Sequence, residues 1–428
     1  MTTFVPLLVL LIVLGLGLPV AISLLLAGSL GIMLIGGQEL LAGILSSAPG
    51  SALKSYELLT IPMFILMAEL MSASGIANSL FAAIAAWTSR VRGGLGIATA
   101  MTGAAFGAVS GSSTAAAVTL SKTTIPALLN QGYTPRMAGG VVAISGTLAM
   151  LIPPSIALIF YGLLSGANIA ELLVAGMIPG VLVTLVIALI FRYYISPKTD
   201  EATAPRYTLK EKIQSLKVAG PFALLFIVVI SLIYTGIATP VESSAIGALG
   251  ALILTAAYRR LNFMTLKTVL LNTCSTSAMI GLLIVCAHVF SYFLAMTGTT
   301  QTIVQSVGTL NISPYFILFG LVLFYLILGL FLDMLSILIL TVPVALPIVV
   351  GLGFDPVWFG IFVIVLAELG IVTPPVGMNA FVVSRTANIP VEEVFAGVLP
   401  YIIGILCLIV LMIVFPDIIM WLPNHMRS

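Results

Sequence analysis

The sequence predicts an all-α membrane protein that crosses the bilayer many times. Hydrophobic residues make up 61% of its 428 residues and charged residues only 7%, whereas a soluble protein carries roughly 25% charged residues. Apolar stretches of helix length recur along the whole chain, unlike the short alternating segments of a membrane β-barrel. These observations exclude a soluble enzyme and a barrel, and they make the lipid bilayer an expected partner.

Charge and cysteine content exclude further classes. The 16 Lys and Arg and the 14 Asp and Glu residues leave a net charge of +2, so we expect no basic face and no nucleic-acid partner. Cys274, Cys286 and Cys407 lie in apolar runs, where we expect buried small side chains rather than a disulfide or metal set. Residues 1–53 contain no Lys or Arg, so the positive flank of a cleavable signal peptide is missing.

An internal repeat relates the two halves of the chain at an offset of 221 positions. At this offset Pro153-Pro154 falls on Pro374-Pro375, and an E-x-x-x-A-G-x-x-P string that begins at Glu171 recurs at Glu392. Chance supplies single Gly or Pro coincidences more readily than two Pro-Pro pairs and a shared string. The sequence therefore predicts a duplicated unit, which is common among transporters.

The distribution of basic residues indicates that the two repeats are inverted. Residues 88–136 carry four Lys and Arg, whereas the equivalent 309–357 carry none. Conversely, 258–267 carry three and the equivalent 37–46 carry none. Because positively charged loops stay in the cytoplasm, the same structural position lies inside in one half and outside in the other.

Hydrophobic runs then give the elements in order. The first half is predicted to contain spans at 4–18, 19–36 and 57–73, a surface helix at 77–90, a re-entrant hairpin at 93–131, a broken span at 137–164 and a span at 171–192. The second half is predicted to contain spans at 218–238, 240–257 and 278–296, a surface helix at 300–309, a hairpin at 314–350, a broken span at 356–386 and a span at 394–415. The two runs of the first hairpin are slightly shorter than the roughly 20 residues that a crossing needs.

These elements define the domain organisation. The first inverted repeat covers residues 1–192 and the second covers 218–428, with about ten spanning helices and two hairpins in total. The polar stretch 193–217 is expected to be a cytoplasmic loop that links them. In this arrangement both termini face the periplasm or exterior.

Four segments interrupt apolar helix with glycine, proline and small polar residues. They are the two hairpin tips at 109–114 and 331–336 and the two mid-span segments at 145–154 and 368–375. A double proline removes two backbone donors, and the carbonyls that it frees need protein, water or an ion as a partner in hydrocarbon. Such carbonyls, with nearby hydroxyl or carboxylate oxygens, suit a small cation such as sodium. The helix that restarts after each break directs its positive end at the same region, which suits an anionic substrate.

Each hairpin tip is expected to face the break of its own half, which predicts two cation sites and two or more coupling sodium ions. The expected ligands are the Ser110 and Ser112 hydroxyls with the carbonyls of Ala149, Ile152 and Pro154 for the first site, and Asp333 with Gly370, Thr373 and Pro375 for the second. The alternative is that these are ordinary proline kinks and helix contacts, in which Gly, Ser and Thr are common. Because a hairpin tip and a break are paired in both halves, we favour cation sites over ordinary kinks.

Other polar residues near the breaks are weaker candidates. Ser155 and Asn379 follow the two double prolines and are predicted to contact substrate. Arg385 is placed with them, although a side chain near the end of a span also snorkels to the interface. Glu368, just before the second break, is either a structural hydrogen-bond partner or part of the site.

Two other functions remain open at this point. An intramembrane aspartyl protease would use Asp333 and Asp355, but Asp355 lies in a Gly-Phe-Asp-Pro turn, where we expect a helix cap. The other is a stand-alone ion-coupled permease without partner subunits.

Five motifs make the chain resemble a known family. They are G-S-S-T-A-A-A at 111–117, L-I-P-P-S-I at 151–156, A-T-P-V-E-S-S-A at 238–245, G-L-F-L-D at 329–333 and E-L-G-I-V-T-P-P-V-G-M-N at 368–379. Together they resemble the large membrane subunit, of the M or DctM-like type, of tripartite ATP-independent periplasmic (TRAP) transporters. The resemblance spans about residues 5–420, and its last motif is the most specific.

The resemblance implies an elevator-type transporter of the inner membrane, in which the hairpins and broken spans move against a scaffold of outer helices. It implies sodium-coupled uptake of a small organic acid, of the sialic acid or C4-dicarboxylate class, and no enzymatic activity. It also implies two partners: a small four-helix membrane subunit of the Q type and a periplasmic substrate-binding protein of the P type. The chain contains no G-x-x-x-x-G-K-[ST] motif for ATP, which agrees with ion-driven transport.

Overall fold

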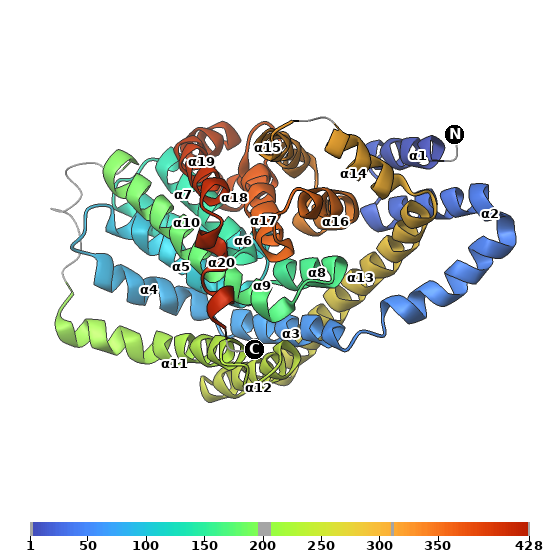
Figure 1. The fold of residues 1–428 in the computed structure, drawn as a ribbon. Helices are drawn as coiled ribbons and strands as arrows, with labels where there is room; N and C mark the ends of the chain where they lie inside the picture. Colours follow the sequence, from blue (N-terminus) through green and yellow to red (C-terminus); the bar gives the residue numbers. More distant parts are fainter. Residues whose placement is uncertain (1–2, 196–206, 310–311, 427–428) are drawn as a thin grey trace.

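The computed structural model describes residues 3–195, 207–309 and 312–426, and all regular structure in these ranges is helical (Figure 1). Within them, eight helices are long and apolar enough to cross a membrane, or nine if α11 is counted across a bend of 53°. The predicted all-α polytopic fold is therefore confirmed. The division into two inverted repeats remains a prediction.

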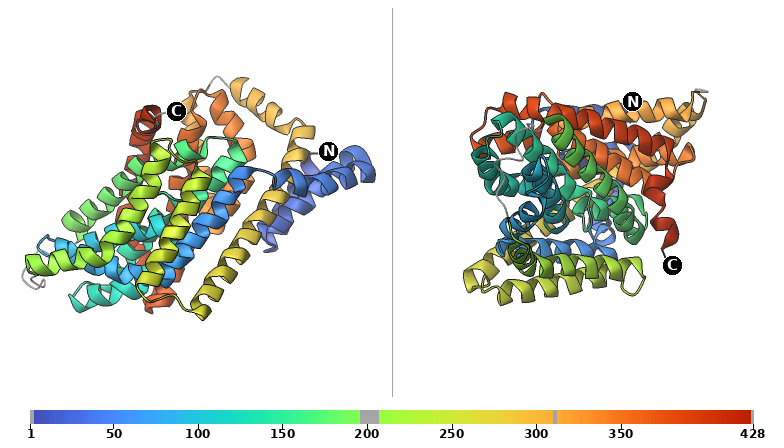
Figure 2. Two further views of the ribbon diagram at one scale, coloured as in Figure 1. Left: turned by 90° about the horizontal axis from the view of Figure 1, so that it is seen from below. Right: turned by 90° about the vertical axis from the view of Figure 1, so that its left-hand side faces the viewer.

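One group of helices runs along the lower edge and the right-hand end of the molecule in Figure 1, and Figure 2 shows it from two further sides. This outer group consists of α1 (Phe4–Gly15), α2 (Val20–Ala52), α3 (Thr60–Ala73), α11 (Leu209–Tyr234), α12 (Pro240–Ala257) and α13 (Phe263–Met296). Small residues let these helices pack closely, because a Cβ atom on Gly28 of α2 would lie 2.9 Å from the Cα of Phe290 of α13. Close backbone approach through small residues is the usual way in which helices associate in membranes.

A second group forms the inner bundle, which contains the hairpins and broken spans. Its helices are α5 (Gly94–Ser110), α6 (Ser113–Asn130), α7 (Pro135–Thr147), α8 (Ile156–Ser165), α9 (Ile169–Ala175), α10 (Met177–Ile190), α15 (Pro314–Phe331), α16 (Met334–Gly351), α17 (Pro356–Val372), α18 (Met378–Ala387), α19 (Val391–Val414) and α20 (Asp417–Met420). Two further helices, α4 (Ile76–Thr88) and α14 (Thr299–Thr309), join the outer group to the bundle. Both coincide with the predicted surface helices.

Helix starts in the bundle recur at the offset seen in the sequence. The second helices of the two hairpins begin at Ser113 and Met334, and the two broken spans begin at Pro135 and Pro356. Each pair is 221 positions apart. The caps also correspond: the Thr134 hydroxyl and the Asp355 carboxylate each accept hydrogen bonds from the backbone N–H groups of the helix that follows.

Two outer helices are longer than the hydrophobic runs predict. Helix α2 continues past Gly37, whose φ of 75° bends the chain at the end of the predicted span. Helix α13 begins at Phe263 instead of 278, because the Asn262 side chain caps it by accepting from the Thr265 N–H at 2.7 Å. The polar residues of these segments lower the hydropathy below that of a span without preventing helix formation.

Two smaller expectations were wrong. The last part of the linker 193–217 is helical rather than loop, since α11 begins at Leu209 behind a capping box in which Thr208 and Glu211 satisfy each other's backbone N–H groups. Residues 196–206 of that linker lie outside the described ranges. Among the cysteines only Cys286 is buried, whereas Cys274 and Cys407 are exposed free thiols. In a membrane protein an exposed apolar face meets lipid, so burial is not required there.

Candidate functional site

The first hairpin turns through a glycine followed by a serine cap. Helix α5 ends at Ser110, Gly111 has a φ of +56°, and the Ser112 hydroxyl caps α6 by accepting from the Ala115 N–H at 3.4 Å. A left-handed residue at this position favours glycine. The Ser110 hydroxyl is buried without a hydrogen-bond partner, so one of the predicted ligand oxygens lacks a protein donor.

The first double proline breaks its span as predicted. Helix α7 ends at Thr147, a 3-10 turn (Leu148–Met150) follows, and α8 restarts at Ile156. The Pro153-Pro154 peptide bond is cis, as is Pro374-Pro375 in the second half. The Ser155 hydroxyl is fully buried, donates to the Met150 carbonyl and caps α8 by accepting from the Leu158 N–H at 3.3 Å. The Ser155 hydroxyl therefore makes one hydrogen bond as a donor and one as an acceptor, both to the backbone of the protein.

The structure brings the first tip and the first break together. A Cβ atom on Gly107 would lie 2.6 Å from the Cα of Ala149, and one on Gly111 would lie 3.0 Å from Cγ1 of Ile156. Ala149 and Pro154 are buried in this region. The side chain of Ile152 packs against α10, where a Cβ atom on Gly180 would meet its Cγ1 at 2.5 Å. The predicted first-site residues therefore share one neighbourhood.

The second tip and break form the matching pair. The Asp333 carboxylate caps α16, accepts from the Leu335 N–H at 3.2 Å and also accepts from the Ser336 hydroxyl. A Cβ atom on Gly329, one turn before this tip, would lie 2.6 Å from the Cα of Gly370. Asp333 is exposed, so its carboxylate is accessible to water or to an ion.

Thr373 makes the local hydrogen bonds at the second break. The Thr373 hydroxyl donates to the Leu369 carbonyl at 2.6 Å, and the Thr373 N–H donates to the Gly370 carbonyl at 3.0 Å. Pro375 is exposed. A carbonyl has two lone pairs, so the Gly370 oxygen retains capacity for a cation.

Of the predicted substrate contacts, Asn379 has the more informative environment. Asn379 lies in the first turn of α18 and is fully buried, and neither its Oδ1 nor its Nδ2 has a hydrogen-bond partner. Buried amides are normally paired, so this side chain is available to a ligand. Arg385 lies exposed in the last turn of α18. The structure therefore does not bring the two side chains to the same end of the helix.

Glu368, for which the sequence leaves open a structural role or a place in the site, is buried beside the second break. It is 3% exposed, both carboxylate oxygens lack a hydrogen-bond partner, and Ser113 of the first hairpin lies close to it. A small cavity with room for about one water molecule lies beside Glu368 and Thr147, which are 221 positions apart in the sequence. The signal in the sequence was an acid within an apolar run directly before a double proline.

The geometry does not support an aspartyl protease. Asp333 caps the start of α16, whereas Asp355 follows its end and accepts from the Val357 N–H at 2.6 Å as the cap of α17. Helix α16 has 18 residues, so the two carboxylates are separated by roughly 27 Å of helix. A catalytic pair must share a site within a few ångströms.

Comparison with protein families gives a match over nearly the whole chain. Residues 7–418 match the family described as tripartite ATP-independent periplasmic transporter, DctM component. Relatives include the sialic acid TRAP transporter large permease protein SiaM of Vibrio cholerae, 32% identical over 417 residues and covering 95% of each chain. The C4-dicarboxylate TRAP transporter large permease protein DctM of Pseudomonas aeruginosa is 32% identical over 371 residues and 86% of each chain. The ectoine/5-hydroxyectoine TRAP transporter large permease protein UehC of Ruegeria pomeroyi is 31% identical, covering 99% of this chain and 98% of the relative.

Solved structures share the fold at low identity. The YdaH transporter of Alcanivorax borkumensis has a TM-score of 0.67 with 16% identity and covers 90% of each chain. MtrF of Neisseria gonorrhoeae, from a class of antimetabolite efflux pumps, has a TM-score of 0.59 with 16% identity, covering 91% of this chain and 85% of that one. The relatives are transporter subunits and not enzymes. The chain belongs to the DctM family of tripartite ATP-independent periplasmic transporters and is a multi-pass protein of the bacterial inner membrane.

Proposed function

We propose that the chain is the translocation subunit of a sodium-coupled importer of a small organic acid. The observation that carries the proposal is the pairing, in each half, of a hairpin tip with a broken span: Gly107 against Ala149 and Gly329 against Gly370. Each pair places a polar tip beside backbone that a double proline has released from helical hydrogen bonding. Two such places at membrane depth supply oxygen ligands for two cations.

Sodium provides enough driving force for this task. Each sodium ion that moves inward gains about 2.3 kcal/mol per 100 mV from the membrane potential, so two ions outweigh the cost of moving one monoanion against it. Coupling requires the substrate site to form only when the cation sites are filled, a linkage of typically 1–3 kcal/mol. Asn379, one turn beyond Pro375 and buried without a hydrogen-bond partner, is the side chain that we assign to the substrate.

An elevator movement of the inner bundle against the outer helices is the mechanism that the packing favours. A cavity of about 310 Å³ separates α8 and α16 of the bundle from α2 and α13 of the outer group, with His288 and Ser291 among its lining residues. Elsewhere the outer helices pack closely on each other, as at Gly28 and Phe290. A loosely packed boundary between two tightly packed groups suits rigid-body sliding.

Membership of the family suggests the partner subunits and the class of substrate. We propose that a periplasmic binding protein delivers the substrate, that a small four-helix membrane subunit completes the complex, and that both termini of this chain face the periplasm. The names of SiaM and DctM favour the sialic acid or C4-dicarboxylate class of cargo. The alternative, a stand-alone ion-coupled permease, would transport without either partner.

Reconstitution tests the proposal directly. Proteoliposomes with this chain, its small subunit and the cognate binding protein should take up labelled organic acid only with an inward sodium gradient, and a sodium ionophore should abolish the uptake. Uptake driven equally well by potassium would refute sodium coupling. Full uptake from free substrate, without the binding protein or small subunit, would establish the stand-alone permease instead.

A further inference from the structure

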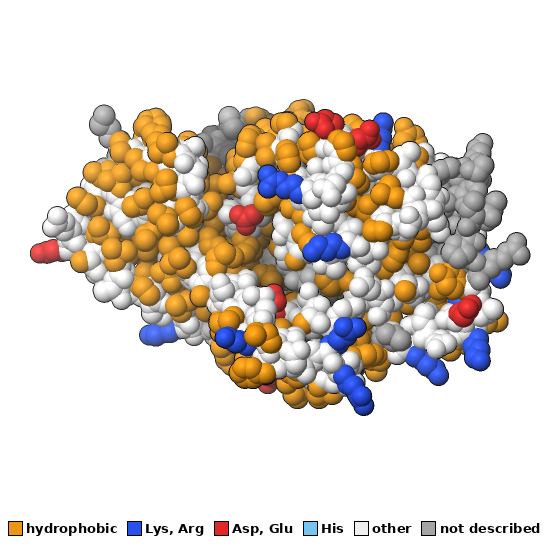
Figure 3. All heavy atoms as spheres, turned by 180° about the vertical axis from the view of Figure 1, so that it is seen from behind, with side chains coloured by type: hydrophobic (Ala, Val, Ile, Leu, Met, Phe, Trp, Pro, Cys, Tyr) orange, Lys and Arg blue, Asp and Glu red, His pale blue; other side chains and the backbone are white. Residues whose placement is uncertain are grey.

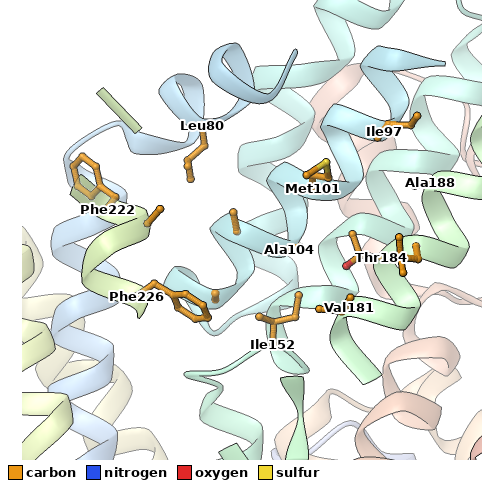
Figure 4. Close-up of a pocket in the computed structure, with 14 residues that line it drawn as sticks. Leu80, Ile97, Met101, Ala104, Ile152, Val181, Thr184, Ala188, Phe222 and Phe226 are labelled. Carbon is orange, nitrogen blue, oxygen red and sulfur yellow. The ribbon is translucent and has the colours of Figure 1, made fainter. Parts of the chain in front are cut away.

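An apolar cavity of about 430 Å³ lies between α4, α5, α10 and α11, and Ile152 is the one residue that it shares with the candidate transport site (Figure 4). Leu80, Ala104, Val181 and Phe226 represent its four walls, and Ile152 closes one end. The cavity therefore separates α11, which belongs to the outer group, from α5 and α10 of the inner bundle. Ile152 belongs to the first broken span, so an occupant of the cavity touches that segment.

The chemistry of the lining selects a hydrocarbon occupant. Thr184 is the one lining residue with a polar side chain, and its hydroxyl is already satisfied because it donates to the Gly180 carbonyl at 2.7 Å. A water molecule needs two to four polar partners, and these walls offer none. Hydrophobic side chains also cover much of the face that Figure 3 shows, as expected for a chain surrounded by lipid.

The four helices that form the cavity bring basic residues together at one end. The indole N–H of Trp87, at the end of α4, donates to the Lys212 carbonyl near the start of α11 at 3.3 Å, and the Lys212 ammonium lies 5.6 Å from the Trp87 ring centroid. A Cβ atom on Gly96, near the start of α5, would meet Phe191 at the end of α10. The ends of all four helices therefore lie at the same level of the molecule.

Charge at this level is strongly positive. Among residues 87–96, 190–195 and 207–217 there is one acid, Glu211, against the basic residues Arg90, Arg92, Arg192, Lys210, Lys212 and Lys217. Basic residues between helices at the cytoplasmic interface attract anionic lipid headgroups at about 1 kcal/mol per charge, and Trp side chains gather at the same depth. Lys212 lies just before the 53° bend of α11 and Phe222 just after it, so the basic segment leads directly into the part of α11 that lines the cavity.

We propose that this cavity holds one acyl chain of an anionic phospholipid whose phosphate lies at the basic ends of α4, α10 and α11. The tail then fills the space between the outer helix α11 and the inner helices α5 and α10, and it contacts Ile152 beside the first break. Lipid binding here is independent of ion coupling, so its test does not depend on the proposed transport function.

Native mass spectrometry of the purified full-length chain tests the site. The wild type is titrated with dioleoyl phosphatidylglycerol or with dioleoyl phosphatidylcholine, which have the same tails and differ in net charge. The first adduct should form preferentially with phosphatidylglycerol. Ala104→Phe or Ala188→Phe, which fill the cavity from two of its walls, should abolish this adduct, and the double variant R90Q/K212Q should weaken it roughly 25-fold, at about fivefold per charge.

Matched variants exclude general effects. Ile253→Phe places the same ring on an exposed face of α12, and R259Q/R260Q removes two exposed charges from a different loop; neither should change the adduct. If either Ala104→Phe or Ala188→Phe unfolds at a lower temperature than the wild type, the other variant still provides the test. Equal binding of both lipids, or undiminished binding by both filled variants, would overturn the proposal. Loss of the adduct from the wild type when the small subunit is added would assign the cavity to that subunit.

Discussion

The backbones of Gly329 and Gly370 touch without side chains between them, because a Cβ atom on Gly329 would lie 2.6 Å from the Cα of Gly370. Gly329 is one turn before the tip of the second hairpin, and Gly370 is in the last turn of α17 before its break. This contact fixes the tip beside the break. The first half uses Gly107 and Ala149 in the same way, also at 2.6 Å.

Gly329→Ala should impair transport by separating the second tip from its break. The added methyl group meets backbone atoms that cannot rotate away, so overpacking should cost about 1–3 kcal/mol. Uptake in proteoliposomes should fall at least severalfold, with a lower temperature of unfolding. Gly320→Ala is the matched control on the same helix, since nothing lies within 4 Å of its Cβ position. Equal activity of the two variants would show that the close approach is not required.

Asp333→Asn should separate the charge of this residue from its role as a helix cap. Asparagine caps a helix about as well as aspartate, so the fold should be retained while the proposed cation site loses its formal charge. The sodium concentration for half-maximal uptake should rise about tenfold or more, as expected for loss of a charge-assisted contact. Asp355→Asn, at the cap of α17, is the control and should leave sodium dependence unchanged. An unchanged sodium dependence in Asp333→Asn would show that Asp333 acts only as a helix cap.

Ser112→Ala should weaken both the first hairpin and its cation site. Removing the cap costs typically about 1 kcal/mol of helix stability, so the protein should remain folded in the membrane. Sodium-dependent uptake should nevertheless be lost, because the tip loses one of the proposed ligand oxygens. Ser112→Asn, which restores a capping oxygen, provides the comparison. If Ser112→Asn recovers stability but not uptake, Ser112 is supported as a cation ligand. If it recovers both, Ser112 acts only as a helix cap.

Asn379→Ala should weaken substrate use without destabilising the fold. Both polar atoms of this amide are buried and unpartnered, so their removal leaves no protein group unsatisfied. We expect the KM for the organic acid to rise about tenfold, the effect of losing one or two good hydrogen bonds, while the unfolding temperature stays the same or rises. Asn272→Ala is the control, because that amide pairs with Glu69 in the outer helices. An unaltered KM would remove Asn379 from the substrate site.

Glu368→Gln and Glu368→Ala should differ in sodium affinity if Glu368 positions the first tip through Ser113. Glutamine preserves the size and hydrogen-bonding capacity of the side chain toward Ser113, whereas alanine removes both. The alanine variant should need about fivefold to tenfold more sodium for half-maximal uptake, the equivalent of one hydrogen bond, and the glutamine variant should restore the wild-type value. Identical sodium curves for the two variants would mean that Glu368 acts only in packing.

Much of the candidate site was predictable from local sequence. Proline lacks a backbone donor wherever the chain places it, so both double-proline breaks were predicted, as was the cap at Asp355. Ser112 and Asp333 were predicted as ligands, and the structure shows that both also cap helices. The unpartnered amide of Asn379 was not predictable, because whether a buried group finds a partner depends on side chains from distant segments. The same holds for Glu368, whose neighbour Ser113 is remote in sequence.

The sequence by itself determined that the chain is a polytopic helical membrane protein and where its helices break, because hydropathy and missing backbone donors act within a few residues of the chain. Tertiary structure alone decided that α2 and α13 extend through polar segments, that Gly329 faces Gly370, and that an apolar cavity with a basic end opens between α4, α5, α10 and α11. These features depend on how helices from distant parts of the chain pack against one another. Packing is set by the joint shape of many side chains, which no local pattern records.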